Sequence, residues 1–84
     1  MRLDKWLKVS RLIKRRTVAQ EACDGGRVSV NGRVAKPSCD VKCGDVIEVS
    51  FGARTLRAEV LSVQETVKKD EAAAIYREIG ADNQ

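Results

Sequence analysis

The sequence contains no histidine, one proline and only three aromatic residues among its 84 positions. Histidine is the usual general base near neutral pH, so its absence removes the commonest form of acid–base catalysis. Neither a phosphate-binding lysine loop nor a G-x-G-x-x-G motif is present. Three aromatic residues are also too few for a series of base-stacking platforms. These absences predict a binding protein rather than an enzyme, and one that needs no cofactor.

The three cysteines, Cys23, Cys39 and Cys43, are an odd number without a secretory signal. A structural zinc site needs four ligands, and no histidine is available to complete one. We therefore expect no metal site, and reduced thiols in a cytoplasmic protein. No stretch approaches the roughly eighteen apolar residues that could span a membrane.

Positive charge is concentrated in the first half of the chain. Residues 1–36 hold ten Lys or Arg against three Asp or Glu, whereas residues 37–84 hold six against nine. Such a dipolar distribution favours an anionic partner, and clustered Lys and Arg are typical of a nucleic-acid footprint. An acidic protein partner, a membrane surface and DNA are the alternatives. The candidate RNA-binding residues are Arg2, Lys5, Lys8, Arg11, Lys14, Arg15 and Arg16.

The N-terminal segment has helical periodicity over residues 3–13. We expect Trp6 to be a core residue, and Asp4 to act as a cap or as a first-turn residue. One arc of this helix carries Leu3, Trp6, Leu7, Val9, Ser10 and Ile13, opposite Lys5, Lys8 and Arg11.

A second helix is predicted from Thr17 to Asp24. Thr17 and Gln20 have the spacing of a capping box, and Gly25-Gly26 is a helix stop signal. Arg15 and Arg16 would then lie just outside a helix N-terminus, where the exposed N–H groups and the dipole favour a phosphate.

Short alternating segments follow. Asn31-Gly32 between β-branched residues predicts a hairpin with a type I′ turn. Two further strands are predicted, one with Phe51 among its core residues and one over residues 55–63. The spacing of apolar residues from position 72 to 79 predicts a short C-terminal helix beginning near Asp70 and ending near Gly80. The predicted fold is α+β: two N-terminal helices on a small, mostly antiparallel sheet.

Several motifs in this order resemble the RNA-binding domain of the ribosomal protein S four type, also called the alpha-L motif. The motifs are Arg2-Leu3-Asp4-Lys5-Trp6-Leu7, Arg15-Arg16-x-x-Ala19, Gly26-x-Val28-x-Val30-Asn31-Gly32, Lys36-Pro37-Ser38 and Gly44-Asp45-x-Ile47. The resemblance covers residues 2–51 and implies recognition of structured RNA, with Arg2 and Arg16 on positions expected to bind it. The domain is expected over residues 1–64, with a helical extension over 65–84.

The chain is most similar to two small stand-alone types within this family: a ribosome quality-control factor and a heat-shock ribosome-associated protein. The first type implies binding to large ribosomal subunits that carry peptidyl-tRNA, with contacts to both rRNA and tRNA. It also implies a partner factor that adds an alanine tail to the stalled nascent chain. We expect a monomer in this role. The alternatives are a ribosome-assembly or heat-shock rRNA-binding factor and a basic protein-interaction module.

Overall fold

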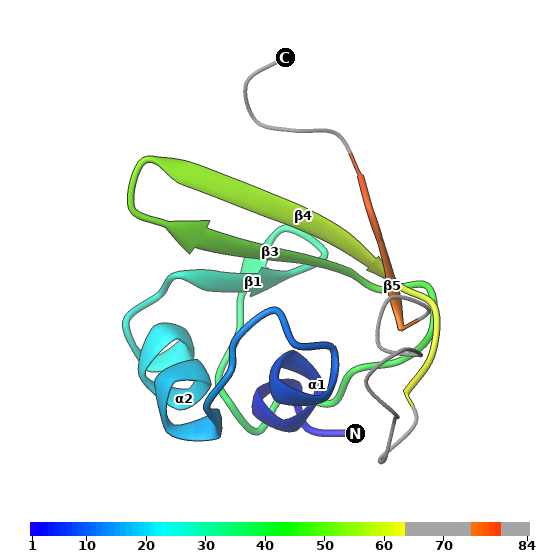
Figure 1. Cartoon of the computed structure of the whole chain (residues 1–84), viewed down its shortest axis with the longest axis horizontal. Helices are drawn as coiled ribbons and strands as arrows, with labels where there is room; N and C mark the ends of the chain where they lie inside the picture. The colour runs from blue at the N-terminus through cyan, green and yellow to red at the C-terminus, as the bar shows by residue number, and fades with distance from the viewer. Residues whose placement is uncertain (64–74, 80–84) are drawn as a thin grey trace.

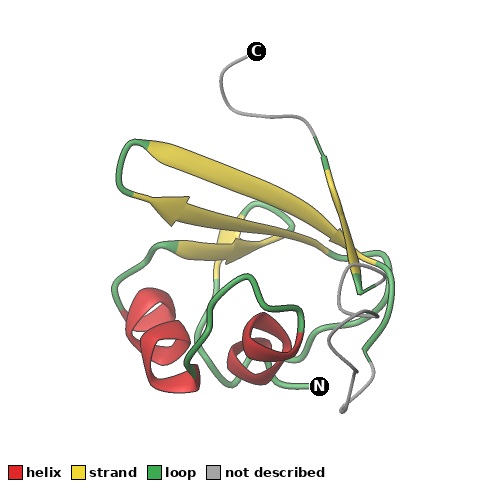
Figure 2. Cartoon of the chain, viewed as in Figure 1, coloured by secondary structure: helices red, strands yellow, loops and turns green. Residues whose placement is uncertain are grey.

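The computed structural model describes residues 1–63 and 75–79 of the chain. Two helices cover one face of an antiparallel sheet whose strand order is β2-β1-β3-β4-β5 (Figures 1 and 2). The elements are α1 (Leu3–Val9), α2 (Arg16–Asp24), β1 (Val28–Val30), β2 (Arg33–Val34), β3 (Val46–Phe51), β4 (Arg54–Val60) and β5 (Tyr76–Glu78). The predicted α+β class, with two helices on an antiparallel sheet, is confirmed.

Helix α1 ends four residues before the predicted boundary at Ile13. Arg11 adopts a left-handed conformation with φ of 65°, which stops the helix. The Ser10 hydroxyl, itself buried, donates to the Leu7 carbonyl at 3.1 Å and accepts from the Leu12 N–H. Ile13 is buried all the same, because its N–H donates to the Leu7 carbonyl at 3.1 Å and turns the loop back onto the core.

Helix α2 begins at Arg16, with Arg15 as its N-cap residue in an extended conformation. The predicted capping box at Thr17 and Gln20 is wrong, since no side chain caps this helix. Gln20 instead donates to Asp4 of the neighbouring helix, at 2.9 Å. The end of the helix at Asp24 is confirmed.

The β1–β2 hairpin has the predicted turn at Asn31-Gly32. Both central residues have positive φ, 53° and 86°, as a type I′ turn requires. The Asn31 side chain also accepts from the Val46 N–H at 2.9 Å and donates to Asp45 at 3.1 Å. The turn is therefore attached to the start of β3 as well as closing its own hairpin.

The C-terminal prediction is wrong where the structure describes it. Tyr76–Glu78 is a strand, β5, that pairs antiparallel with β4. The predicted helix start at Asp70 lies outside the described residues. Strand pairing satisfies the edge of β4, which would otherwise present unpaired N–H and C=O groups. It also buries Ile75 and sets Tyr76 edge-on to Trp6, with ring centroids 6.4 Å apart.

The core lies between the helices and the sheet. Trp6 is fully buried, as predicted, and its indole N–H donates to the Ser62 carbonyl at 3.1 Å. Phe51, also predicted to be core, is 45% exposed because it lies at the tip of the β3–β4 hairpin. The main buried side chains are Leu3, Trp6, Leu7, Ile13, Val28, Val41, Ile47, Val49, Val60 and Ile75.

Three further structural findings bear on function. In the part of the chain that the structure describes, no helix is long and apolar enough to cross a membrane. No group of three metal-ligating side chains occurs within residues 1–63 and 75–79. Cys23 is buried, and burial raises the pKa of its thiol to about 11, so it is a protonated core side chain at neutral pH.

Candidate RNA-binding surface

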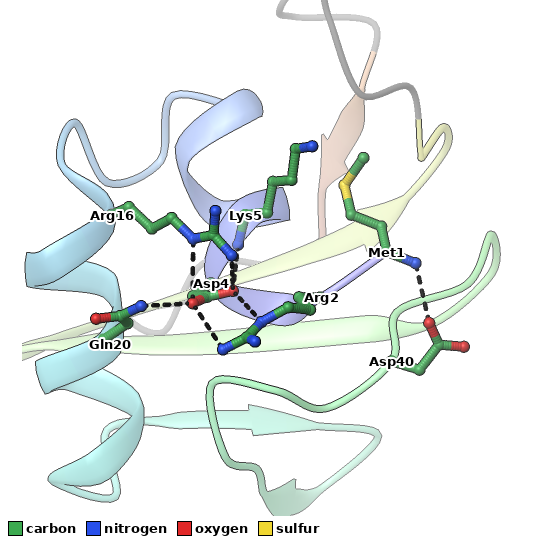
Figure 3. A network of polar contacts seen from close by, with 7 residues as sticks. All are labelled: Met1, Arg2, Asp4, Lys5, Arg16, Gln20 and Asp40. Atoms are coloured by element: carbon green, nitrogen blue, oxygen red, sulfur yellow. Dashed lines mark hydrogen bonds and ion pairs between the residues drawn. The ribbon is translucent and has the colours of Figure 1, made fainter.

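A buried carboxylate organises the basic residues between the two helices (Figure 3). The side chain of Asp4 has no exposed surface, although it lies in the first turn of α1. Its Oδ1 accepts from Arg2 Nε at 3.2 Å and from the Lys5 main-chain N–H at 2.7 Å. Its Oδ2 accepts from Arg16 Nε at 3.2 Å and from Gln20 Nε2 at 2.9 Å. The carboxylate thus joins α1, α2 and the residue preceding α1 in one cluster.

This environment keeps Asp4 ionised. Burial alone opposes the charged form of the carboxyl group. The hydrogen bonds from Gln20, Arg16, Arg2 and the Lys5 N–H act in the other direction and hold the pKa of Asp4 below its ordinary value of 3.8. The cluster therefore carries one negative and two positive charges at neutral pH.

The two guanidinium groups are fixed on one side and open on the other. Each donates to Asp4 through Nε and Nη2, while the side chains of Arg2 and Arg16 remain 52% and 41% exposed. A guanidinium has five N–H donors, so each arginine keeps donors for an anion in solvent. Two arginines with restricted orientation are well suited to phosphate oxygens, which they bind bidentately.

The segment that carries Arg2 is held by the loop that follows the hairpin. The Leu3 N–H donates to the Cys39 carbonyl at 2.8 Å, and the Asp4 N–H donates to the Pro37 carbonyl at 3.1 Å. Arg2 itself forms an isolated antiparallel bridge with Asp40. The Asp40 carboxylate accepts from the Met1 ammonium group at 2.9 Å, which lowers the pKa of that carboxyl (Figure 3). Main-chain bonds on both sides of Arg2 therefore fix where its side chain starts.

The S4 domain family model matches residues 1–47, a range that contains the Asp4 cluster, both helices and the first hairpin. The chain belongs to the S4 domain family. The resemblance to the RNA-binding domain of ribosomal protein S four is thereby confirmed.

Proteins similar to this S4 domain include two that are each named RQC P-site tRNA stabilizing factor. The protein from Bacillus subtilis is 57% identical over 90% of this chain and 88% of its own length. The protein from Halalkalibacterium halodurans is 55% identical over 90% of this chain and 86% of its own length. Among solved structures, the trimeric structure of Vibrio cholerae heat shock protein 15 matches with a TM-score of 0.87. It is 35% identical, and the match covers 94% of this chain and 81% of that one.

The remaining candidate residues of this S4 domain lie along one stretch of chain, from the middle of α1 to the start of α2. Lys8, Arg11, Lys14 and Arg15 are all exposed. The predicted helical arc for Arg11 is wrong, because this residue follows the end of α1. Lys5 is half-buried beside Asp4, and its side chain is drawn with the cluster in Figure 3. We name the exposed group Lys8, Arg11, Lys14 and Arg15 the basic loop.

Arg11 is held in a conformation that a non-glycine residue adopts at a cost. The left-handed region is unfavourable by about 1–2 kcal/mol for a residue with a Cβ. Leu12 and Ile13 pack on the core immediately afterwards, so the loop is anchored and its strain is maintained. Strained backbone of this kind is concentrated at functional sites. The RNA-binding role of Arg11 remains a prediction.

Sequence reasoning missed Asp4 and Gln20 as members of the cluster. Asp4 is predicted only as a cap or a first-turn residue, and Gln20 only as part of a capping box. A signal for Asp4 was present, since it is the only acidic residue among the first twenty, beside seven basic ones. A single carboxylate in so basic a segment is attracted to several cations at once. The signal for Gln20 is tertiary, because it depends on how α1 and α2 pack.

Proposed function

We propose that this S4 domain binds large ribosomal subunits that still carry peptidyl-tRNA after a stalled ribosome has split. The observation that carries the proposal is the similarity to RQC P-site tRNA stabilizing factors over most of both chains. The Asp4 cluster adds the chemistry, since it presents two oriented arginines in a domain whose family binds RNA. The partners are rRNA of the large subunit and the peptidyl-tRNA.

In this role the domain is a binder and not a catalyst. Arg2 and Arg16 hold phosphates, while Lys5 and the basic loop add electrostatic attraction along the RNA backbone. A tRNA fixed in this way remains in place while an alanine-tailing partner factor extends the nascent chain. We place the protein in the cytoplasm and expect it to act as a monomer, at one copy per subunit.

A direct test uses purified large subunits with and without peptidyl-tRNA. Tagged protein is mixed with each preparation, and the bound fraction is measured after pelleting. We expect stronger binding to the subunits that carry peptidyl-tRNA, and shorter alanine tails in cells that lack the protein. Arg16→Ala should reduce the bound fraction, whereas Arg57→Ala should not. Arg57→Ala is a matched control because this substitution removes the same charge from the sheet face that points away from the helices.

A heat-shock or ribosome-assembly factor that binds rRNA without supporting tailing is the second candidate. The structural similarity to heat shock protein 15 favours it. Equal binding to subunits with and without peptidyl-tRNA would support this second candidate. Absence of binding to either preparation would contradict both.

A further inference from the structure

The β3–β4 hairpin presents an exposed aromatic ring next to an arginine. Phe51 and Arg54 are Cα partners in the antiparallel register, and they flank the two-residue turn Gly52-Ala53. Gly52 has φ of 60°, and glycine with positive φ at the first turn position is typical of a tight type II′ hairpin. Directly opposed residues on one face of such a pair have Cβ atoms roughly 4.5–5.5 Å apart. The turn therefore holds the ring and the arginine side by side.

The hairpin tip extends beyond the part of the sheet in which β1 pairs with β3. Along β3, Ile47 and Val49 are buried. Phe51 belongs to the same face of the strand but is 45% exposed. The pairing of β1 with β3 reaches only Val49, so the tip lies past the end of β1 (Figure 1). Arg27, at the end of the α2–β1 connection, accepts the Ser50 N–H on its carbonyl at 2.8 Å. A second arginine therefore lies near the base of the tip.

The arginines at the tip differ from Arg57 and Arg77, which lie farther along β4 and on β5. Arg57 and Arg77 each form an ion pair with a glutamate of the sheet. Arg27 and Arg54 are exposed, and neither forms an ion pair with a carboxylate among residues 1–63 and 75–79. An exposed apolar ring with an unneutralised guanidinium group beside it is complementary to a nucleotide. The ring matches an unpaired base, and the cation matches its phosphate.

We propose that Phe51 and Arg54 form a separate RNA contact that stacks one unpaired base and binds the adjacent phosphate. The inference rests on the proposed function in that it takes RNA as the partner, and it adds a contact of a different kind. The Asp4 cluster binds backbone, which duplexes and loops share, whereas the hairpin tip needs a base that has left its stack. Stacking on a single ring accepts any of the four bases, because every base has a π-face.

The test compares two RNA probes of equal charge. One is a stem-loop with a loop of unpaired uridines, and the other is a blunt duplex with the same number of phosphates. Affinities of the full chain are measured by fluorescence anisotropy. Phe51→Leu, which keeps an apolar side chain but removes the π-face, should weaken binding to the stem-loop about tenfold and leave the duplex unchanged. Phe51→Trp should retain the wild-type preference for the stem-loop.

Two controls separate stacking from charge and from general apolar contact. Arg54→Ala should lower the slope of log affinity against log salt by about one, because one phosphate contact is lost. Val34, on β2, is another exposed apolar residue, with 68% of its surface exposed. Val34→Ala should change the affinity for neither the stem-loop nor the duplex. With 5-iodouridine in the loop, ultraviolet irradiation should cross-link the RNA to the peptide that contains Phe51.

The outcomes distinguish this inference from the proposed function. Wild-type affinity of Phe51→Leu for the stem-loop would overturn the stacking contact and leave the role of the Asp4 cluster intact. If Phe51→Leu kept its affinity for both RNA probes but lost ribosome binding, the stacking contact would also be overturned. The hairpin tip would then be assigned to a protein partner. A tenfold loss on the stem-loop in a protein that never pellets with large subunits would support the stacking contact and contradict the ribosomal function.

Discussion

Ion pairs lie on both sides of the sheet, and they differ in burial and in net charge. Between the helices, one fully buried carboxylate, Asp4, is shared by two half-exposed arginines, which leaves a net positive charge. On the opposite face, Glu48 pairs with Arg57 at 3.0 Å and Glu59 pairs with Arg77 at 2.8 Å. These outer pairs are neutral and open to solvent, where an ion pair is worth about 0–1 kcal/mol.

The difference shows what burial of an acidic residue does for a basic surface. A buried ion pair is weak evidence for stability, because desolvation offsets much of the attraction. Asp4 has a positional effect instead, since it restricts two guanidinium groups that would otherwise sample many rotamers. Pre-organisation of this kind reduces the entropy lost when a ligand binds. The outer pairs restrict their arginines without leaving charge for an anion.

Of the substitutions considered, replacement of Asp4 should produce the largest difference in unfolding free energy between the two faces of the sheet. Asp4→Ala leaves the Lys5 N–H and the Gln20 amide without their acceptor, and we expect unfolding to become easier by about 2–4 kcal/mol. Glu48→Ala on the outer face should change the unfolding free energy by roughly 1 kcal/mol or less. Urea denaturation of both variants measures the contrast. Equal changes in unfolding free energy for the two variants would mean that the burial of Asp4 does not contribute to stability.

Acid should weaken the Asp4 cluster in a defined direction. A carboxyl whose folded pKa lies below its unfolded value contributes stability that is present above the unfolded pKa and is lost as the pH falls through the folded pKa. For Asp4 the loss should begin near pH 3.8 and continue below it. Asp4→Asn should remove this part of the pH dependence. The measurement is the urea midpoint between pH 7 and pH 2, and an unchanged profile in Asp4→Asn would contradict the assignment.

Removing one arginine of the cluster should affect RNA binding more than folding. We expect Arg16→Ala to weaken binding to a structured RNA by about 1–3 kcal/mol, the usual range for a charge-assisted contact. Arg16→Lys keeps the charge but loses the two-pronged contact with Asp4, and should recover only part of the affinity. Circular dichroism and anisotropy titrations separate folding from binding. Full recovery by lysine would show that charge alone matters at this position.

Relieving the backbone strain at Arg11 should give the smallest change in the free energy of unfolding. Unlike the Asp4 substitution, it should stabilise the fold. Glycine adopts positive φ without the Cβ penalty, so Arg11→Gly should stabilise the fold by about 0.5–1 kcal/mol despite the greater freedom of the unfolded chain. Arg11→Ala keeps the strain and serves as the control. Both variants should bind RNA more weakly than the wild type. A stabilised Arg11→Gly protein with unchanged RNA affinity would remove Arg11 from the binding surface.

Local signals predicted those parts of the fold that local interactions determine. Asn31-Gly32 specified its turn because both residues tolerate positive φ, and the helical spacing of Trp6 identified it as core. The failures occurred where a distant partner decided the outcome. Gln20 left its expected cap for Asp4, and Tyr76 joined β4 in a strand although its spacing fits a helix. Phe51 alternates like a core residue, but strand alternation does not reveal how far a hairpin extends past the neighbouring strand.

The candidate site was predicted in composition and not in arrangement. Basic residues from Arg2 to Arg16 could be selected by charge, and their roles remain predictions. That Arg2 and Arg16 meet on one carboxylate depends on the packing of α1 against α2, which spacing along the chain does not specify.

The most direct measurement is gradient fractionation of lysates from cells that produce tagged wild-type protein, Arg16→Ala or Arg57→Ala. Each fraction is probed for the tag and for peptidyl-tRNA. We expect the wild type and Arg57→Ala to migrate with free large subunits that carry peptidyl-tRNA, and Arg16→Ala to move toward the top of the gradient. Wild-type migration of a well-folded Arg16→Ala protein would contradict the role of the Asp4 cluster in RNA binding.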